Sequence, residues 1–156
     1  MTAPGVSLKD AARRRPRSLL EVVQWAETGQ GSTDAYLREF LDEFYVEQKS
    51  EQRAAMLVIE PALQEVERTN AYLAAVAEHL ALKNGLPIPD WTNQPERFLK
   101  LPFFPAGLES LKATLLVESP PAFRRRLIFV GADPLYRPRR DVQGFTAQPL
   151  ETGHQP

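Results

Sequence analysis

The chain has 156 residues and no cysteine, so it can form neither a disulfide framework nor a thiolate metal site. Its two histidines, His79 and His154, are too few for a histidine metal triad, and we predict no metal and no cofactor. A formal net charge of -1 excludes a uniformly basic nucleic-acid-binding or membrane-surface protein. No apolar run approaches the roughly 18–20 residues of a membrane-spanning helix, and no apolar core follows the N-terminal arginines as in a secretory signal. These absences predict a cytoplasmic protein that does not enter a membrane.

Motifs for catalysis are also missing. The sequence has neither a glycine-rich phosphate loop nor a nucleophile elbow. Glu78 and His79 are adjacent, whereas metal ligands on one helix face need a Glu-x-x-His spacing. We therefore predict that His79 is a packed or surface residue. The acidic run of Glu39, Asp42, Glu43 and Glu47 could bind magnesium, but a solvated helix face is the favoured interpretation. The chain is accordingly predicted not to be an enzyme.

The length suits one domain with tails, and a domain of this size can bury a substantial core. The basic N-terminus predicts a flexible arm over residues 1–17. Periodic apolar positions predict a helical domain over residues 18–136. The C-terminal segment, residues 137–156, is predicted to be extended or disordered.

Apolar spacing and capping residues predict four helices in the first half of the domain. Ser18 and Glu21 have the spacing of a capping box. The longest helix is apolar nearly all round, which predicts a position at the centre of a bundle, and Asn84 with Gly85 is predicted to end it. The expected ranges are 18–28, 33–46, 51–59 and 63–83. The first helix is capped by Ser18, the second by Ser32 or Thr33, and the third by Ser50.

The second half is dominated by proline. Residues 86–105 contain five prolines among aromatic residues, which predicts an ordered loop packed onto the helices. A helix over 108–117 and a short helix after Ser119 are expected next, followed by a β-like apolar run over 127–130. The fold class is therefore predicted to be mainly α: a single compact helical bundle with a proline-rich packed loop and flexible basic termini.

Charge is segregated along the chain. From Glu21 to Glu67 there are eleven acids and three bases, whereas residues 121–140 contain six arginines and one acid. Residues 1–20 contain four arginines and one lysine against one acid. Such blocks steer partners, but the basic ends could equally fold onto the acidic helices of the same molecule. The sequence leaves both interpretations open.

Arginine suits bidentate binding to carboxylate or phosphate, so the C-terminal arginines are the candidate partner-binding residues. Because consecutive helical residues point about 100° apart, at least one of Arg124–Arg126 should lie against the body and pair with Glu109, Glu118 or an acid of helix 33–46. Trp91 is a further candidate because it could stack on a base, although a tryptophan in a proline-rich loop usually plugs a core. The full set of candidates is Arg124, Arg125, Arg126, Arg137, Arg139, Arg140 and Trp91.

Three segments carry a resemblance: AEHLALKNGLPIPDW, PERFLKLPFF and ESLKATLLVESPPAFRRRLIFVGADPLYRPRR, all between residues 77 and 140. They resemble a family of uncharacterised small helical bacterial proteins, whose segment is also found behind helix-turn-helix domains, and RPRSLLEVV at residues 15–23 extends the likeness. The resemblance implies an antitoxin-like neutraliser or adaptor that binds a partner protein such as a nucleotidyltransferase-type toxin. The alternative is a nucleic-acid-binding transcriptional regulator that uses the C-terminal arginine cluster.

Overall fold

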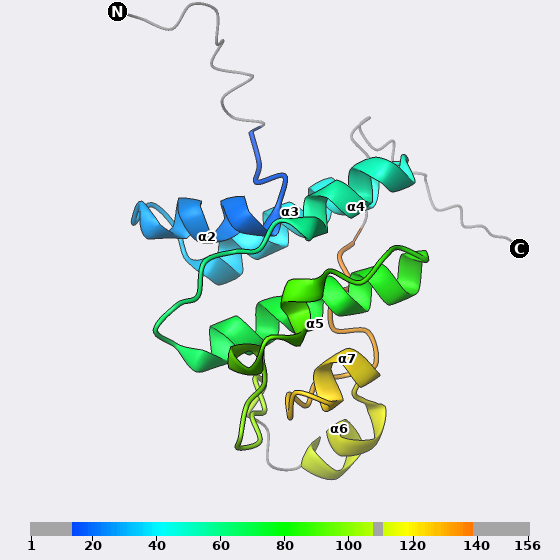
Figure 1. Cartoon of the computed structure of the whole chain (residues 1–156). Coiled ribbons are helices and arrows are strands. Elements are labelled where there is room, and N and C mark those ends of the chain that lie inside the picture. Colours follow the sequence, from blue (N-terminus) through cyan, green and yellow to red (C-terminus); the bar gives the residue numbers. More distant parts are fainter. Residues whose placement is uncertain (1–13, 108–110, 139–156) are drawn as a thin grey trace, which may run out of the picture.

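The computed structural model describes residues 14–107 and 111–138 of the chain. Six α-helices and two short 3₁₀ helices are present in these ranges. Helices α2, α3 and α4 form one layer, α5 crosses the middle of the molecule, and α6 and α7 lie on the other side of α5 (Figure 1). The predicted mainly α bundle is confirmed.

The first two helices begin where their caps predict. In α2, Leu19–Glu27, the Ser18 hydroxyl accepts a hydrogen bond from the Glu21 amide at 3.1 Å. The Glu21 carboxylate in turn accepts from the Arg17 amide, so the capping box closes one residue earlier than the standard form. Helix α3, Thr33–Val46, starts after Ser32, whose hydroxyl accepts from the Ala35 amide.

Helix α4 spans Ser50–Val58, so Ser50 is its first residue and not its cap. Helix α5 spans Glu67–Asn84 and starts four residues later than predicted. The cause is Asn70, whose side chain makes hydrogen bonds of 2.7 and 2.9 Å with the backbone N–H and C=O of Gln64. These bonds hold the preceding chain outside the helix. Gly85 ends α5 in a left-handed conformation at φ 65°, as predicted.

The core surrounds α5. Nine consecutive residues of this helix, Leu73 to Ala81, are all buried, and apart from Glu78 and His79 they are alanines and larger apolar side chains. Phe40 and Phe44 of α3 meet them from one side and Phe123 of the C-terminal half from the other. The alanines let both layers approach α5 closely, which is why a helix with little amphipathic character occupies the centre.

The proline-rich loop is packed down, as predicted, and contains the 3₁₀ helices η1, Asp90–Asn93, and η2, Pro95–Arg97. Helices α6, Lys112–Glu118, and α7, Pro121–Arg124, follow. Within the described ranges the predicted β-like run makes only an isolated parallel bridge, Phe103 to Ile128. Leu127 adopts a left-handed conformation at φ 64°, which interrupts an extended strand and aims its carbonyl at the Phe103 amide.

No helix in the described part of the chain is long and apolar enough to cross a membrane.

Candidate functional site

Arg126, the last of the three consecutive arginines, is completely buried. Its guanidinium binds three segments: Nη1 donates to Glu78 Oε1 at 2.6 Å and to the Ala122 carbonyl at 2.8 Å, and Nη2 donates to the Thr92 carbonyl at 2.7 Å. Burial lowers the pKa of Arg126, and the hydrogen bond to Glu78 opposes this shift. The guanidinium therefore ties α5, α7 and η1 together.

Arg126 is predicted to bind a partner, whereas in the structure no part of its side chain reaches the surface and its contacts are with the fold itself. The expectation that one arginine of the cluster pairs with a carboxylate of the body is confirmed, but the carboxylate is Glu78 and none of the predicted acids. Glu118 is exposed on α6, and Glu109 lies outside the described residues. Sequence spacing gave no signal for Glu78, which is 48 residues away.

Arg124 and Arg125 are both exposed but hold internal contacts. Arg124 Nη2 donates to the Ser119 carbonyl at 2.7 Å and to the Val117 carbonyl at 3.2 Å, so it caps the end of α6. Arg125 Nε donates to Glu78 at 3.2 Å and its Nη2 to Asn93 at 2.7 Å. Phe98 lies beneath the guanidinium groups of Arg125 and Arg126. All three arginines of the cluster thus stabilise the C-terminal half.

Trp91, also predicted to bind a partner, is buried, with 6% of it exposed. Its indole Nε1 donates to the Leu57 carbonyl at 3.0 Å, which fastens η1 to the end of α4. The guanidinium of Arg97 lies over the indole, 4.8 Å from the ring centroid. Trp91 is the core plug that the alternative interpretation described.

Arg97 is a second fully buried arginine that sequence reasoning missed. Its Nη2 donates to the Pro61 carbonyl at 2.7 Å and to the Glu60 carboxylate at 3.4 Å. Burial lowers the pKa of Arg97, while the hydrogen bond to Glu60 raises it. We call Arg97 and Arg126 the buried arginine pair.

The described parts of both basic ends lie on α3. Arg15 and Arg17 form ion pairs with Glu43, and Arg17 also reaches Glu47. From the other end, Arg137 makes a bidentate contact with Asp42 at 3.0 and 3.1 Å, which raises the pKa of Arg137. We call Asp42, Glu43 and Glu47 the acidic face of α3.

These pairs support the interpretation in which opposite charges meet within one molecule. Three of the four carboxylates considered for magnesium are engaged by arginine. In the described ranges no group of three or more histidines and acids is arranged to hold a metal ion. Arg139 and Arg140, also predicted to bind a partner, lie outside the described residues.

His79 is a packed residue, in agreement with the prediction. Only 8% of it is exposed, and its ring meets Phe123 edge-on at a centroid distance of 5.6 Å. Burial lowers the pKa of His79, the Lys83 ammonium lowers it further, and Asp133 acts in the opposite direction. The neutral imidazole is therefore favoured in the folded protein.

A different surface presents apolar side chains to solvent. On α6, Ala113, Leu116 and Val117 have the i, i+3, i+4 spacing that places side chains on one helix face. Ala113 is exposed, as are 47% of Leu116 and 76% of Val117, whereas Leu115 points into the body. We call this face the α6 ridge. No residue pattern of the chain as a whole predicted it, because an apolar helix position normally indicates burial.

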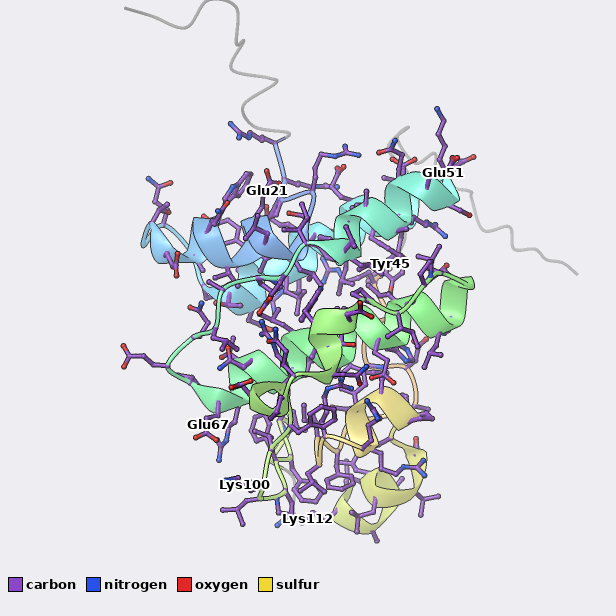
Figure 2. The ribbon with its side chains drawn as sticks, in the orientation of Figure 1. Glu21, Tyr45, Glu51, Glu67, Lys100 and Lys112 are labelled. Carbon is purple, nitrogen blue, oxygen red and sulfur yellow. The ribbon has the colours of Figure 1, made fainter. Side chains whose placement is uncertain are left out.

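Charged residues of both signs border the α6 ridge, because Glu118 is exposed at the end of α6 beside two cations. Arg124 lies at the C-terminal end of α6 and Lys112 begins the helix, with its ammonium 5.0 Å from the centroid of the Phe104 ring. Lys100 and Lys112 occupy the end of the molecule farthest from α2 and α4 (Figure 2). Beside Lys100, 77% of Leu101 is exposed. The surface thus combines apolar contact area with charged residues of both signs at its edges.

Comparison of the chain with protein-family models, with curated proteins and with solved structures gives no match.

Proposed function

We propose that this protein is a non-enzymatic protein-binding module, an antitoxin-like neutraliser or adaptor whose α6 ridge contacts a partner such as a nucleotidyltransferase-type toxin. The single observation that carries the binding role is the α6 ridge. A helix at a protein surface normally turns polar residues to water, and α6 turns Leu116 and Val117 outward instead.

The spacing of the ridge suits helix-in-groove recognition, in which residues at i, i+3 and i+4 enter an apolar groove of the partner. The partner is therefore a protein with an apolar groove.

The engaged state of the arginine cluster favours this proposal over nucleic-acid binding. An arginine that contacts DNA must have guanidinium N–H groups available to donate to phosphate oxygens. Arg126 is buried, and the side chains of Arg124, Arg125 and Arg137 already donate hydrogen bonds within the molecule.

The test uses the purified product of the gene next to the one encoding this protein. Its affinity is measured by isothermal titration calorimetry for the parent chain, for Val117→Glu and for the control Val58→Glu. Val58 is 57% exposed at the end of α4, away from α6, so it matches Val117 in residue type and surface position. We expect Val117→Glu to raise the Kd at least about tenfold, equivalent to about 1.4 kcal/mol, and Val58→Glu to leave it unchanged.

No complex with that product, or equal affinities for all three chains, would overturn the proposal. So would binding to duplex DNA that weakens steeply with salt and is lost when Arg124 and Arg125 are replaced by glutamine, because that result supports the regulator alternative.

A further inference from the structure

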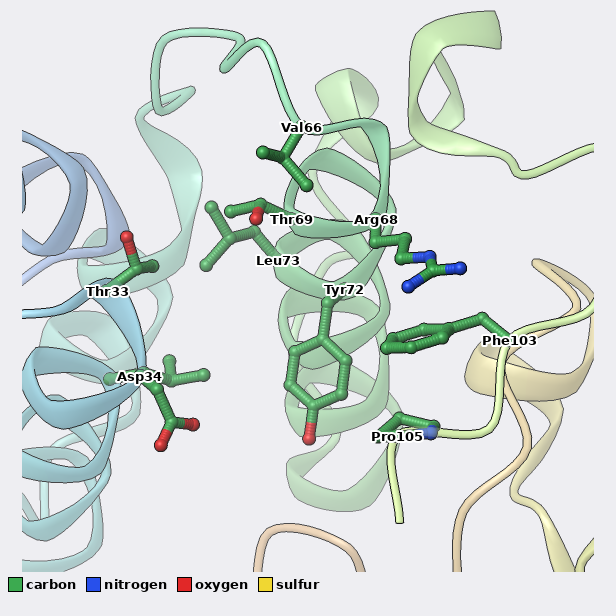
Figure 3. Close-up of a pocket in the computed structure, with 10 residues that line it drawn as sticks. Thr33, Asp34, Val66, Arg68, Thr69, Tyr72, Leu73, Phe103 and Pro105 are labelled. Carbon is green, nitrogen blue, oxygen red and sulfur yellow. The ribbon is translucent and has the colours of Figure 1, made fainter. Parts of the chain in front are cut away.

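A pocket of about 350 Å³ lies between the first turns of α3 and α5, closed on one side by the loop that carries Phe103 and Pro105. It is separate from the α6 ridge, none of whose residues line it. Figure 3 shows Thr33 and Asp34 on one side, Tyr72 in the middle, and Arg68 with Phe103 on the other. Its volume lies in the range of small-molecule sites, about 300–1,000 Å³.

Most of the lining is apolar. Leu37 and Leu73 are buried core residues that also line the pocket. The apolar wall is completed by Val66, Phe103 and Pro105. Such a wall favours the apolar body of a ligand, because water leaves both surfaces when they meet.

Arg68 is the cationic residue of the pocket lining. The Arg68 guanidinium stacks on Phe103, 4.4 Å from the ring centroid. Among the described residues no carboxylate pairs with it, in contrast to Arg17, Arg97 and Arg137. Thr33, Thr69 and Tyr72 also line the pocket, and each of their hydroxyls can both donate and accept a hydrogen bond.

Two further electrostatic features leave Arg68 as the charge of the lining that a ligand can meet. Asp34, the one acid of the lining, forms an ion pair with Arg38 one helical turn away. Burial, followed by the Asp34 charge, raises the pKa of Tyr72 to about 12, so its hydroxyl keeps its proton at neutral pH. A ligand that complements Arg68 and the apolar wall carries a negative charge and an apolar body.

We propose that the pocket binds a small carboxylate with an apolar, aromatic or branched body, held by Arg68 at the carboxylate and by the Leu37–Leu73–Phe103 wall at the body. Arginine binds carboxylates in a bidentate manner, and its stacking on Phe103 fixes the plane of the fork in advance. This ligand site goes beyond the proposed protein-binding function and does not depend on it.

Three probes of one shape test the proposal: 2-naphthoate, 2-naphthylmethanol and 2-naphthylmethylammonium. They are titrated into the ¹⁵N-labelled full chain and followed by NMR. We expect 2-naphthoate to bind with a Kd on the order of 1 mM or below, which is typical of a ligand of this size. The amide signals of Thr33, Arg68, Thr69 and Phe103 should move. The alcohol should bind about tenfold more weakly, because it lacks the charge-assisted hydrogen bonds.

Two variants and one control locate the binding. Arg68→Gln should remove the preference for the carboxylate over the alcohol, and Val66→Trp, which adds bulk at the exposed edge of the pocket, should weaken all binding. Lys83→Gln, at the other end of α5, should change neither. Equal binding of the acid and the alcohol, a preference that survives in Arg68→Gln, or shifted signals elsewhere in the chain would overturn the proposal. Because Arg68 is remote from α6 in sequence and lines a separate surface, Arg68→Gln should still bind the protein partner, so the two proposals can fail independently.

Discussion

The arginines on the acidic face of α3 and the buried arginine pair carry the same charge in different surroundings. Arg17 and Arg137 pair with carboxylates at the surface, where water screens the attraction, and such pairs typically contribute about 0–1 kcal/mol. Arg97 and Arg126 have no exposed side-chain surface. Arg126 pairs with Glu78, whose side chain is 10% exposed, whereas Arg97 reaches Glu60, whose side chain is 40% exposed. Removing one partner from a buried pair typically costs about 3–5 kcal/mol.

A run of arginines in a sequence does not define one surface. Arg124, Arg125 and Arg126 are consecutive, yet one is buried, one caps α6 and one bridges Glu78 to Asn93. Depth below the surface decides their role. The basic segment at 124–126 joins the C-terminal half to α5, whereas Arg137 lies on the exterior of α3.

The largest effect is expected at Glu78. Glu78→Ala leaves Arg126 charged and buried without its carboxylate, so the free energy of unfolding should fall by about 3–5 kcal/mol in urea denaturation. Glu78→Gln keeps an oxygen acceptor of the same shape and should lose less. If the free energy of unfolding of Glu78→Ala lay within about 1 kcal/mol of the parent value, the Arg126–Glu78 ion pair would not hold the C-terminal half as described.

A small effect is expected at Arg137. Arg137→Ala removes a bidentate contact with Asp42, and the side chains of both residues are 25% exposed. The free energy of unfolding should therefore fall by less than about 1 kcal/mol. Arg137→Lys retains the charge, so its free energy of unfolding should lie between those of Arg137→Ala and the parent. A loss above about 2 kcal/mol for Arg137→Ala would erase the distinction between the exterior and buried arginines.

The smallest effect is expected in the pH dependence of stability, and it arises from His79. Since the pKa of His79 is lowered in the folded state, the unfolded chain binds a proton first as pH falls below about 6.5. The contribution of His79 to stability is therefore complete above that pH and declines as pH falls from there toward the folded pKa. His79→Gln should flatten this part of the stability profile, measured by urea unfolding between pH 5 and 8. An unchanged slope would show that His79 does not titrate differently on folding.

Local signals predicted the first half of the fold well. The Ser18 and Ser32 caps, the Gly85 stop and the nearly all-apolar centre of α5 each act within a few residues, and the structure confirms them. The late start of α5 was missed because it depends on the side chain of Asn70 folding back to the Gln64 backbone. Residue spacing carries little information about such a bond.

The candidate site was predicted less well, because its contacts join distant segments. An arginine in a sequence gives no sign of burial, since burial requires a carboxylate and carbonyls that only the fold assembles. Arg126 finds Glu78 across 48 residues, and Arg97 finds the Pro61 carbonyl across 36. The α6 ridge was missed for the opposite reason: Leu116 and Val117 look like core residues until the position of α6 is known.

The most direct test is a pair of double-mutant cycles measured by urea unfolding. One cycle combines Arg126→Met with Glu78→Leu, and the other combines Arg137→Ala with Asp42→Ala. We expect a coupling energy above about 2 kcal/mol for Arg126 with Glu78 and below about 1 kcal/mol for Arg137 with Asp42. Equal coupling energies, or a larger value for Arg137 with Asp42, would contradict the conclusion that the 124–126 cluster joins the C-terminal half to α5.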